Sequence, residues 1–559
     1  MGFLHDLRAA HRRDTASGPR PKNLVYVAYD QLSTSIGALA RAIPEETCIV
    51  LVENAHKAKR RPYHRQKLAL VLANQRHFAL ACARAGYTVR TVVGDAPYRD
   101  LLAPIAREFG ALTMMRAAER ELRVDLAPLV DEGALRVIDH DGFLTTAAQF
   151  ERHAGTRAPW RMDRFYRGVR AETGVLMEGA HPVGGRFSFD DENREPWRGE
   201  PPAPEPPTFP IDDVKREVAA LVAADFAAHP GEIDLARLPA TDDDARALWS
   251  HAKDALLASF GPYEDAMSTR SSTLFHTRVS SLVNLHRLLP RALVDDVARL
   301  DIPLQSKEGF VRQVLGWREF VRHVHDRTDG FRALSMTTAR EAPGDAGYAA
   351  YRGEPFLASR DPRIDGGAAA RDDEGATTLP PAYWGARSGL ACLDHVVDGV
   401  WREGWSHHIT RLMVLSNIAT LLDVDARALT DWFWVAYTDA YDWVVEPNVL
   451  AMGTFSVDVM TTKPYVAGSA YIDRMSDFCD GCAFSPKKDC PITPLYWAYL
   501  ARHGRALAKN PRMKLPLAAL ARRAPERRDE DAATFVAVRE TLARGEALVP
   551  LQKAPRRRA

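Results

Sequence analysis

The hydrophobic pattern of this chain changes character once along its length, and that change predicts two kinds of fold. Helical segments at 64–86 and 96–110 alternate with short apolar runs, which are NLVYVAYDQLS from Asn23, CIVLVEN at 48–54, YTVRTVV at 87–93 and ALTMMR at 111–116. This alternation predicts βαβ units and a parallel, doubly wound sheet. Beyond residue 212 the apolar spacing is almost wholly helical, so we expect a large all-α domain there.

A segment rich in proline and charge separates the two patterns. Residues 190–212, DDENREPWRGEPPAPEPPTFPID, are typical of an extended linker. The 559 residues are enough for two or three domains. We predict a flexible tail at 1–22, an α/β domain at 23–145, an interdomain linker at 146–215, an all-α domain at 216–510 and a helical, basic C-terminal tail at 511–559.

Charge and apolar content exclude several classes of protein. The 74 Lys and Arg residues and the 73 Asp and Glu residues leave a net charge of +1, so nucleic-acid binding requires a local basic patch. The sequence has no apolar run of about 18 residues, the length that predicts a membrane span. The first 22 residues lack the apolar centre of a secretory signal. We therefore expect a soluble, cytoplasmic protein that acts as a monomer.

Four of the six cysteines fall in the last third of the chain. Cys479, Cys482 and Cys490 form a C-x2-C-x7-C pattern, and Cys392 lies some ninety residues upstream. Four thiolates can hold zinc or an iron–sulfur cluster, and the spacing does not choose between them. Four unrelated thiols are the alternative, but a CxxC inside an aromatic, glycine-containing loop favours a metal site. Cys48 and Cys82, in apolar stretches, are expected in the core.

Aromatic and histidine residues also concentrate in the helical part. His407 and His408 are adjacent, and neighbours on a helix point about 100° apart, so one can face a pocket while the other packs. The tryptophans either fill a large core or surround a planar cofactor and pass electrons. Seven of them lie close together in sequence: Trp384, Trp401, Trp405, Trp432, Trp434, Trp443 and Trp497.

Acidic residues mark two further candidate positions. Asp439 and Asp442 are three residues apart in a segment of helical period, where Arg411 can pair with them. Ligands of doubly wound sheets bind at the carboxyl ends of the strands, where this chain places Asp30, Gln31 and Ser33 after the first strand and Glu53 after the second. No GxGxxG follows the first strand, which argues against a standard dinucleotide site.

Several motifs, in order, resemble one family. HHITR, a Trp-rich helix, DAYDW and EPNVLAMGTF are similar to the flavin-binding region of the photolyase/cryptochrome superfamily, as is EGFVRQVLGWREFVRHV. MDRFYRGVRAETGVLMEG, PVGGRFSFDDENREP, TTKPYVAGSAYI and the four cysteines resemble the iron–sulfur bacterial cryptochromes and prokaryotic (6-4) photolyases. The resemblance extends from about Asn23 to about His503, which is most of the chain.

This resemblance implies an α/β antenna domain, a helical domain that binds FAD, and a [4Fe–4S] cluster. It also implies a 6,7-dimethyl-8-ribityllumazine antenna near Asp30, Ser33 and Glu53. The implied cluster ligands are Cys392, Cys479, Cys482 and Cys490; His407, His408 and Tyr465 would lie at the lesion; Trp384 and Trp432 would carry electrons. The implied FAD-binding residues are Tyr263, Leu274, Phe275, His276, Gln313, Arg411, Asp439, Asp442, Glu446 and Asn448.

The chain departs from the family pattern at three positions. The seven-residue spacing before Cys490 is short, which indicates a trimmed cluster loop. Phe433 follows Trp432 where a redox-active tyrosine can occur, and this leaves the electron route open. SVDVM precedes TTKPY in place of an expected glycine pair, which changes the backbone near the lesion.

Two functions remain compatible with the sequence. The resemblance implies light-driven repair of (6-4) photoproducts in UV-damaged DNA, with a cluster that is structural; the alternative is a blue-light photoreceptor with the same cofactors. His407 and His408 favour repair, because signalling needs no acid at a lesion. A zinc-bound structural nucleic-acid protein would leave the FAD-like motifs unexplained. The predicted DNA contacts are the arginines of 162–170, Arg186 and Arg194, and the alternative face is Lys463, Lys487 and Lys488.

Overall fold

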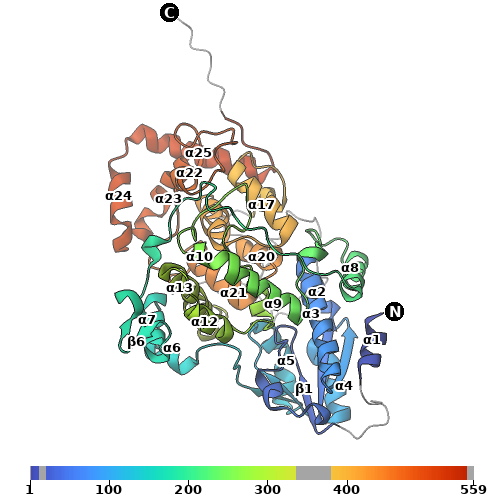
Figure 1. Cartoon of the computed structure of the whole chain (residues 1–559). Helices are drawn as coiled ribbons and strands as arrows, with labels where there is room; N and C mark the ends of the chain where they lie inside the picture. The colour runs from blue at the N-terminus through green and yellow to red at the C-terminus, as the bar shows by residue number, and fades with distance from the viewer. Residues whose placement is uncertain (1, 12–20, 335–378, 551–559) are drawn as a thin grey trace, which may run out of the picture.

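The sheet forms as the alternating pattern predicts. The computed structural model describes residues 2–11, 21–334 and 379–550. Five parallel strands lie in the order β3-β2-β1-β4-β5, and they are β1 (Asn23–Tyr26), β2 (Thr47–Asn54), β3 (Thr88–Gly94), β4 (Leu112–Met115) and β5 (Leu135–Ile138). The order reverses between β1 and β4, where doubly wound folds bind ligands. The predicted α/β fold class is confirmed, and the sheet occupies one end of the molecule (Figure 1).

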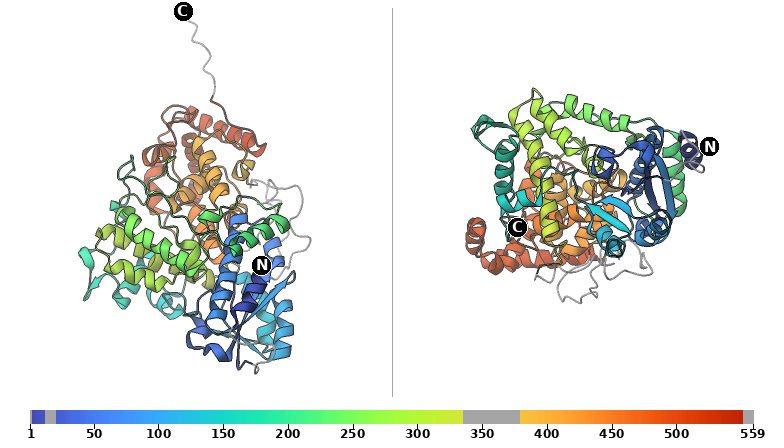
Figure 2. Two further views of the ribbon diagram at one scale, coloured as in Figure 1. Left: turned by 45° about the vertical axis from the view of Figure 1, so that its right-hand side comes forward. Right: turned by 90° about the horizontal axis from the view of Figure 1, so that it is seen from below.

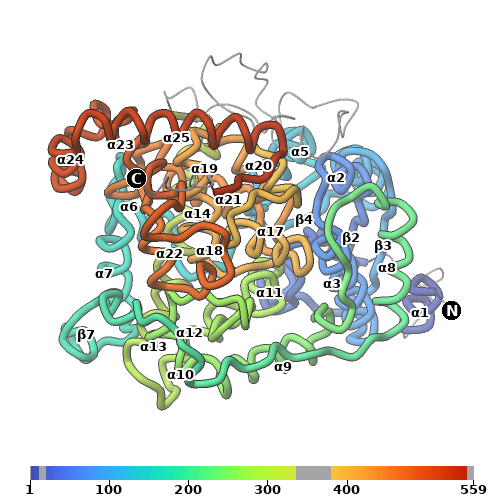
Figure 3. Tube along the Cα trace, turned by 90° about the horizontal axis from the view of Figure 1, so that it is seen from above, coloured from blue at the N-terminus to red at the C-terminus, as the bar shows by residue number. Residues whose placement is uncertain are grey.

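Helices connect the strands and pack against the sheet. They are α2 (Ala55–Lys59), α3 (Arg65–Arg84), α4 (Tyr98–Phe109) and α5 (Arg120–Asp131). α3 is buried along most of its length, from Gln66 to Ala83, since the sheet lies on one side and the helical domain on the other. Figure 3 shows α3 between the strands and the rest of the chain.

The first helix corrects the prediction of a flexible N-terminal tail. α1 (Phe3–Ala10) buries Phe3 and Leu7, which are four residues apart and share one helical face. The Phe3 amide donates to Glu217 at 2.7 Å, and the Arg76 guanidinium lies over the Phe3 ring at 5.0 Å. Two apolar residues one turn apart are enough to attach this segment to α3, so the tail is ordered at its start.

The predicted linker at 146–215 also contains more structure than its composition suggests. α6 (Ala147–Ala154), α7 (Met162–Thr173) and a hairpin of β6 (Met177–Glu178) and β7 (His181–Pro182) fill its first half. Phe150 and Phe165 pack together at 5.6 Å between ring centroids and against Phe320, which anchors the two helices to the helical domain. Residues 193–212 then run without helix or strand to α8 (Asp213–Asp225) on α3.

The remainder is helical, as predicted. Its helices are α9 (Asp242–His251), α10 (Leu257–Phe260), α11 (Ser280–Asn284), α12 (Pro290–Arg299), α13 (Leu304–Val311), α14 (Glu319–Arg327), α17 (Ala391–Glu403), α18 (His408–Thr410), α19 (Asn417–Leu421), α20 (Ala426–Ala436), α21 (Asp442–Glu446), α22 (Ser469–Met475), α23 (Ile492–Leu507), α24 (Lys514–Ala521) and α25 (Pro525–Ala543). Figure 2 shows this bundle beside the sheet, with α24 and α25 outermost. No helix in the described ranges is long and apolar enough to cross a membrane.

Two local features of this domain position the candidate site. The segment of helical period that carries Asp439 and Asp442 is broken, because residues 437–441 leave helical geometry between α20 and α21. Four wide-turn π segments in the described residues also interrupt the bundle, at η6 (Ala252–Leu256), η7 (Arg312–Arg318), η10 (Arg411–Ser416) and η11 (Pro447–Gly453). Such segments are frequent at functional sites, and the last three carry Gln313, Arg411 and Asn448.

Candidate active site

Three histidine rings form the centre of the candidate site. Gly404 follows the last residue of α17, and its φ of +62° turns the chain. His407 then precedes α18 and His408 begins it. The rings of His276 and His407 stack with centroids 4.6 Å apart and an interplanar angle of 5°, while His408 lies 5.4 Å from His276. His407 is buried, whereas the His408 side chain is 44% exposed. One histidine therefore packs and its neighbour faces outward, as the helical geometry predicts.

Their surroundings give the three rings different protonation states. Burial, reinforced by the neighbouring rings, lowers the pKa of His276 and of His407 well below the usual range, so both are neutral at pH 7. Desolvation also favours the neutral form of His408, but its Nε2 lies 3.5 Å from the carboxylate of Asp265. That carboxylate and Glu264 raise the pKa of His408 above its ordinary value. The protonated form is thus favoured at His408 and disfavoured at its two neighbours.

Asp265, which the sequence analysis did not identify, also relates Tyr465 to this site. Burial, followed by the charges of Asp190 and Asp265, raises the pKa of the half-buried Tyr465, which places its hydroxyl near these carboxylates. Tyr471 donates from its hydroxyl to Asp265 at 3.5 Å. Asp265 lies far upstream of the HH motif in an ordinary polar stretch, so only the fold reveals the contact.

Arg411 and Asp439 form the polar floor next to the histidines. The guanidinium of Arg411 donates to both carboxylate oxygens of Asp439 at 3.0 Å, and it lies 4.1 Å above the ring of Tyr437. Ser280 donates to the same carboxylate at 2.7 Å. This bidentate pair stabilises the charged forms of both groups, since the Arg411 guanidinium lowers the pKa of Asp439 despite its burial.

Asp442 does not share this face, because the break after α20 separates the two aspartates. Asp442 instead accepts from the amide of Glu121, in α5 of the sheet domain, at 3.2 Å. Glu446 lies deeper, where it accepts from Arg332 at 2.8 Å, Arg427 at 2.6 Å and His325 at 2.9 Å. Of the two expected partners of Arg411, the structure therefore pairs it with Asp439. Glu446 lies at the centre of a separate, buried network of ionic groups.

The other residues expected around FAD lie mostly near the histidines. Gln313 donates to Glu264 at 2.6 Å, and Glu264 also accepts from Asn193 and Arg312. The ring of Tyr263 packs on that of Phe275 at 5.3 Å, and Leu274 joins them in a small separate core. The side-chain amide of Asn448 donates to the backbone carbonyl of Val444, four residues earlier, at 2.9 Å.

The donor set at this point suits a large anionic cofactor. Nδ1 of His407 and Nε2 of His276 are buried and lack a hydrogen-bond partner among the residues that the structure describes. Such nitrogens are costly unless a ligand satisfies them. The loop of 268–273, STRSST, which precedes His276, supplies hydroxyl and amide groups. These residues fit the family's FAD.

The four C-terminal cysteines gather at one place although they come from three elements. Cys392 is in α17, Cys479 and Cys482 are in the turn after α22, and Cys490 precedes α23. Burial first, then the charges of Cys490, Cys479 and Cys482, raises the pKa of the Cys392 thiol well above its usual range. In the part of the chain that the structure describes, only His276, His407 and His408 offer three ligand atoms all within 4.8 Å of one another. The sulfurs are therefore neighbours at a wider spacing.

A cavity of about 140 Å³ lies between the carboxyl ends of the strands and the helical domain. Its lining includes Glu53 at the end of β2, Tyr63, and Trp434 and Tyr441 from the helical domain. Glu53 is held by two hydrogen bonds of 2.8 Å from Arg76. Asp30 and Ser33 are not among the lining residues; Asp30 is buried beside the cavity, and burial raises its pKa to about 7.

Comparison with known proteins agrees with this architecture. Residues 25–237 match the family model described as deoxyribodipyrimidine photo-lyase-related protein. The curated (6-4) photolyase of Agrobacterium fabrum is 32% identical over 518 residues, which cover 89% of this chain and 95% of that protein.

Two solved structures are also similar. A Synechocystis cryptochrome matches with a TM-score of 0.51 and 13% identity, covering 93% of this chain and all of that one. A class III photolyase of Agrobacterium tumefaciens matches with a TM-score of 0.49 and 16% identity, covering 95% of this chain and all of that one. The resemblance predicted from the motifs is confirmed by the curated relative: the chain belongs to the photolyase/cryptochrome superfamily, with the prokaryotic (6-4) photolyases.

Proposed function

We propose that this protein repairs (6-4) pyrimidine photoproducts in UV-damaged DNA, driven by light and with FAD as cofactor. The observation that carries the proposal is the ion pair of His408 with Asp265 beside the neutral ring of His407. The curated relative's name, (6-4) photolyase, supports it. When bound, reduced FAD supplies the electron that light transfers to the lesion, and the protein residues supply binding, orientation and protons.

His408 is the proton donor in this proposal. A protonated imidazole carries two N–H groups, and Asp265 holds the one at Nε2, which leaves the Nδ1 hydrogen for the substrate. His408 is the exposed member of the trio, so a base flipped out of the duplex can reach it. Protonation of the lesion there allows the transferred oxygen group to return to its original base.

The neighbouring residues hold the flavin and the lesion in place. Arg411, fixed by Asp439, offers its remaining N–H to the cofactor, and Gln313 and His276 border the same space. His407 stays neutral, so its unpartnered Nδ1 can form a hydrogen bond without repelling the charge on His408. Tyr465 closes the side where Asp265 lies.

The four cysteines would hold a [4Fe–4S] cluster with a structural role. Cys479, Cys482 and Cys490 all raise the pKa of the Cys392 thiol, which supports one shared site, and the resemblance of the sequence motifs favours a cluster over a zinc ion. Cys392 joins α17 to the turn after α22, so metal ligation would couple two distant segments to folding.

The cavity of the α/β domain is the proposed place for a 6,7-dimethyl-8-ribityllumazine antenna. Glu53 and the tyrosines around it combine aromatic surface with a few polar groups, as small-molecule sites do. Asp30, which follows β1, would then support the bound antenna from behind the lining residues, and Ser33 would do so from the same loop.

Blue-light irradiation of an oligonucleotide that contains one (6-4) photoproduct tests the proposal. The reduced protein is expected to restore two intact pyrimidines in the light and none in the dark. A protein that binds FAD and undergoes photoreduction but leaves the lesion unchanged would instead be a photoreceptor with the same cofactors.

A further inference from the structure

Trp401 lies between the two tryptophans that the family resemblance assigns to electron transfer. Its indole stacks on Trp384 with centroids 5.0 Å apart and planes 19° from parallel. On the other side it meets Trp432 edge to face at 5.9 Å and 89°. The three indoles thus form a continuous series of ring contacts in which Trp401 is the middle member.

The two ends of this series have different access to solvent. Trp432 is fully buried, whereas Trp384 is only partly buried. Trp432 also leads inward, since its ring lies 6.0 Å from that of Tyr437, which the Arg411 guanidinium covers at 4.1 Å. The series therefore connects the edge of the molecule to the proposed flavin pocket.

Phe433 cannot provide the alternative path. Its ring lies 5.1 Å from Trp432 and stacks on Tyr437, but a benzene ring is far harder to oxidise than an indole. Phe433, at the position where a redox-active tyrosine can occur, therefore cannot carry an electron in this chain. Trp401 also contacts Trp432 and can do so.

The groups around Trp401 suit a residue that is transiently oxidised. The Nε1–H groups of Trp401 and Trp432 both donate to the carbonyl of Tyr383 at 2.9 Å. A carbonyl stabilises positive charge on either indole, but it is too weak a base to take the proton, so an oxidised indole keeps its hydrogen. His64 stacks on Trp401 at 5.7 Å, and burial lowers the pKa of His64 to about 4, so this ring adds no positive charge.

We propose that Trp401 is the middle carrier of an electron route from Trp384 through Trp401 to Trp432, which restores reduced flavin. This inference rests on the proposed FAD-dependent function. With FAD bound, Trp432 would give one electron to the photoexcited flavin, Trp401 would refill Trp432, and Trp384 would refill Trp401. An external thiol would then give one electron to Trp384 and release its proton to water, which returns all three indoles to their starting state. Two such cycles would supply the two electrons of reduced flavin, which takes up one proton from solvent, and the two thiyl radicals would couple to a disulfide.

Transient absorption of the FAD-loaded protein tests the route, with Trp401→Phe as the variant. The oxidised-indole signal is expected to lose its long-lived component, because the electron on the flavin returns to Trp432 directly. Photoreduction by thiol should fall in parallel, and repair by chemically reduced protein should remain at the level of the parent protein. Trp497→Phe is the control, since Trp497 lies on α23 and contacts Tyr496 and Arg523, outside the series.

The apoprotein provides a second measurement that needs no flavin. Stacked indoles at 5.0 Å give an exciton couplet in circular dichroism, which Trp401→Phe and Trp384→Phe should both remove and Trp497→Phe should retain. If Trp401→Phe binds FAD poorly, Trp401→Tyr replaces it; it is expected to slow the route, because the Tyr383 carbonyl cannot accept the phenol proton. An unchanged long-lived signal in either variant overturns the inference, whereas a parent protein that photoreduces normally but repairs nothing overturns only the proposed function.

Discussion

Asp265 is the residue that sets the acidity of the candidate proton donor. Its carboxylate lies 3.5 Å from Nε2 of His408 and raises the pKa of that ring. Asp265→Asn removes this charge, so the His408 pKa should fall and the protonated form should be lost at lower pH. Repair by the reduced variant is therefore expected to decline at a more acidic pH than repair by the parent protein. Asp301→Asn, an exposed aspartate outside the site, should leave the pH profile unchanged, and an unshifted profile in Asp265→Asn would show that Asp265 does not act on His408.

A second prediction at residue scale concerns the buried network around Glu446. This carboxylate is fully buried and accepts from Arg332, Arg427 and His325, and the positive charges of the two arginines hold its pKa well below the usual range despite the opposing effect of burial. Glu446→Gln leaves buried arginines without their counter-charge, which typically costs about 3–5 kcal/mol. Denaturant unfolding should show this loss, with exposed Glu178→Gln as the control. A loss below about 1 kcal/mol, the usual value for a surface pair, would contradict the assigned role.

The sequence identifies individual residues only where a local pattern carries them. His407, His408 and Arg411 stand in one short motif, and their association could be predicted. Asp265 and Trp401 could not be assigned, because their roles come from contacts between segments that are distant along the chain. Asp442 was placed on the wrong face, since helical period alone does not reveal the break at 437–441.

At the scale of elements, the proposed connection between α17 and the turn that carries Cys479 and Cys482 can be tested by a single substitution. If the proposed cluster is bound, Cys482→Ser should reduce the iron content and the yield of soluble protein, because the proposed ligation would join α17 to the turn after α22. Iron analysis and visible absorbance measure the first effect. Cys82→Ala, a buried cysteine in α3, should keep its iron even if it loses some stability. Full iron and normal folding in Cys482→Ser would mean that this cysteine is not a ligand.

Strands and long helices could be predicted from the sequence better than short helices or helices that are held in place by aromatic rings of another segment. The runs that became β1 to β4 are continuous, apolar and bounded by turns, so their pattern is unambiguous. α1 has only Phe3 and Leu7 as apolar contacts, and α6 and α7 are fixed by rings on another segment. Such elements form because a partner surface exists, which one local pattern does not show.

For the whole molecule, a net charge of +1 means that DNA affinity depends on where arginines surround the site. Arg170, in the stretch predicted to contact DNA, is buried and donates to backbone carbonyls. Arg186 is paired with Asp191 and Glu192. Arg194 and Arg270 are also paired, with Asp190 and Asp477, but both are exposed near the site. Arg194 lies 3.9 Å from Asp265, next to His408, and Arg270 and Arg474 lie over the rings of Trp197 and Tyr471.

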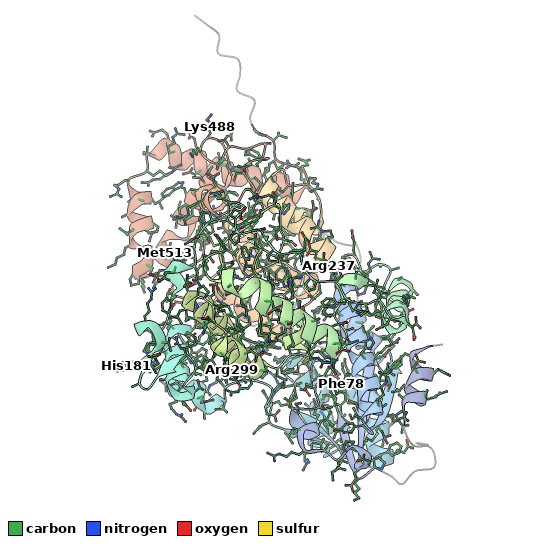
Figure 4. All side chains as sticks on the ribbon, in the orientation of Figure 1. Phe78, His181, Arg237, Arg299, Lys488 and Met513 are labelled. Carbon is green, nitrogen blue, oxygen red and sulfur yellow. The ribbon has the colours of Figure 1, made fainter. Side chains whose placement is uncertain are left out.

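Replacing Arg194, Arg270 and Arg474 with alanine should weaken DNA binding and its salt dependence. Each phosphate contact that is lost lowers the log–log slope by roughly 0.9, so three contacts would lower it by up to about 2.7. Arg299→Ala is the control, because the exposed Arg299 at the end of α12 lies well away from Lys488 (Figure 4). An unchanged slope in the triple variant would place the DNA-binding face elsewhere, with Lys463, Lys487 and Lys488 as the next candidates.

The quantum yield of (6-4) photoproduct repair by His408→Ala, with the flavin reduced chemically beforehand, tests the proposed mechanism most directly. Chemical reduction removes the electron route from the measurement, and the FAD content serves as a check on folding. Loss of a general acid typically costs about 10²–10⁴-fold, and repair should fall by that factor while His181→Ala, on the distant β6–β7 hairpin, repairs normally. Repair by His408→Ala within a few-fold of the parent protein would contradict His408 as the proton donor.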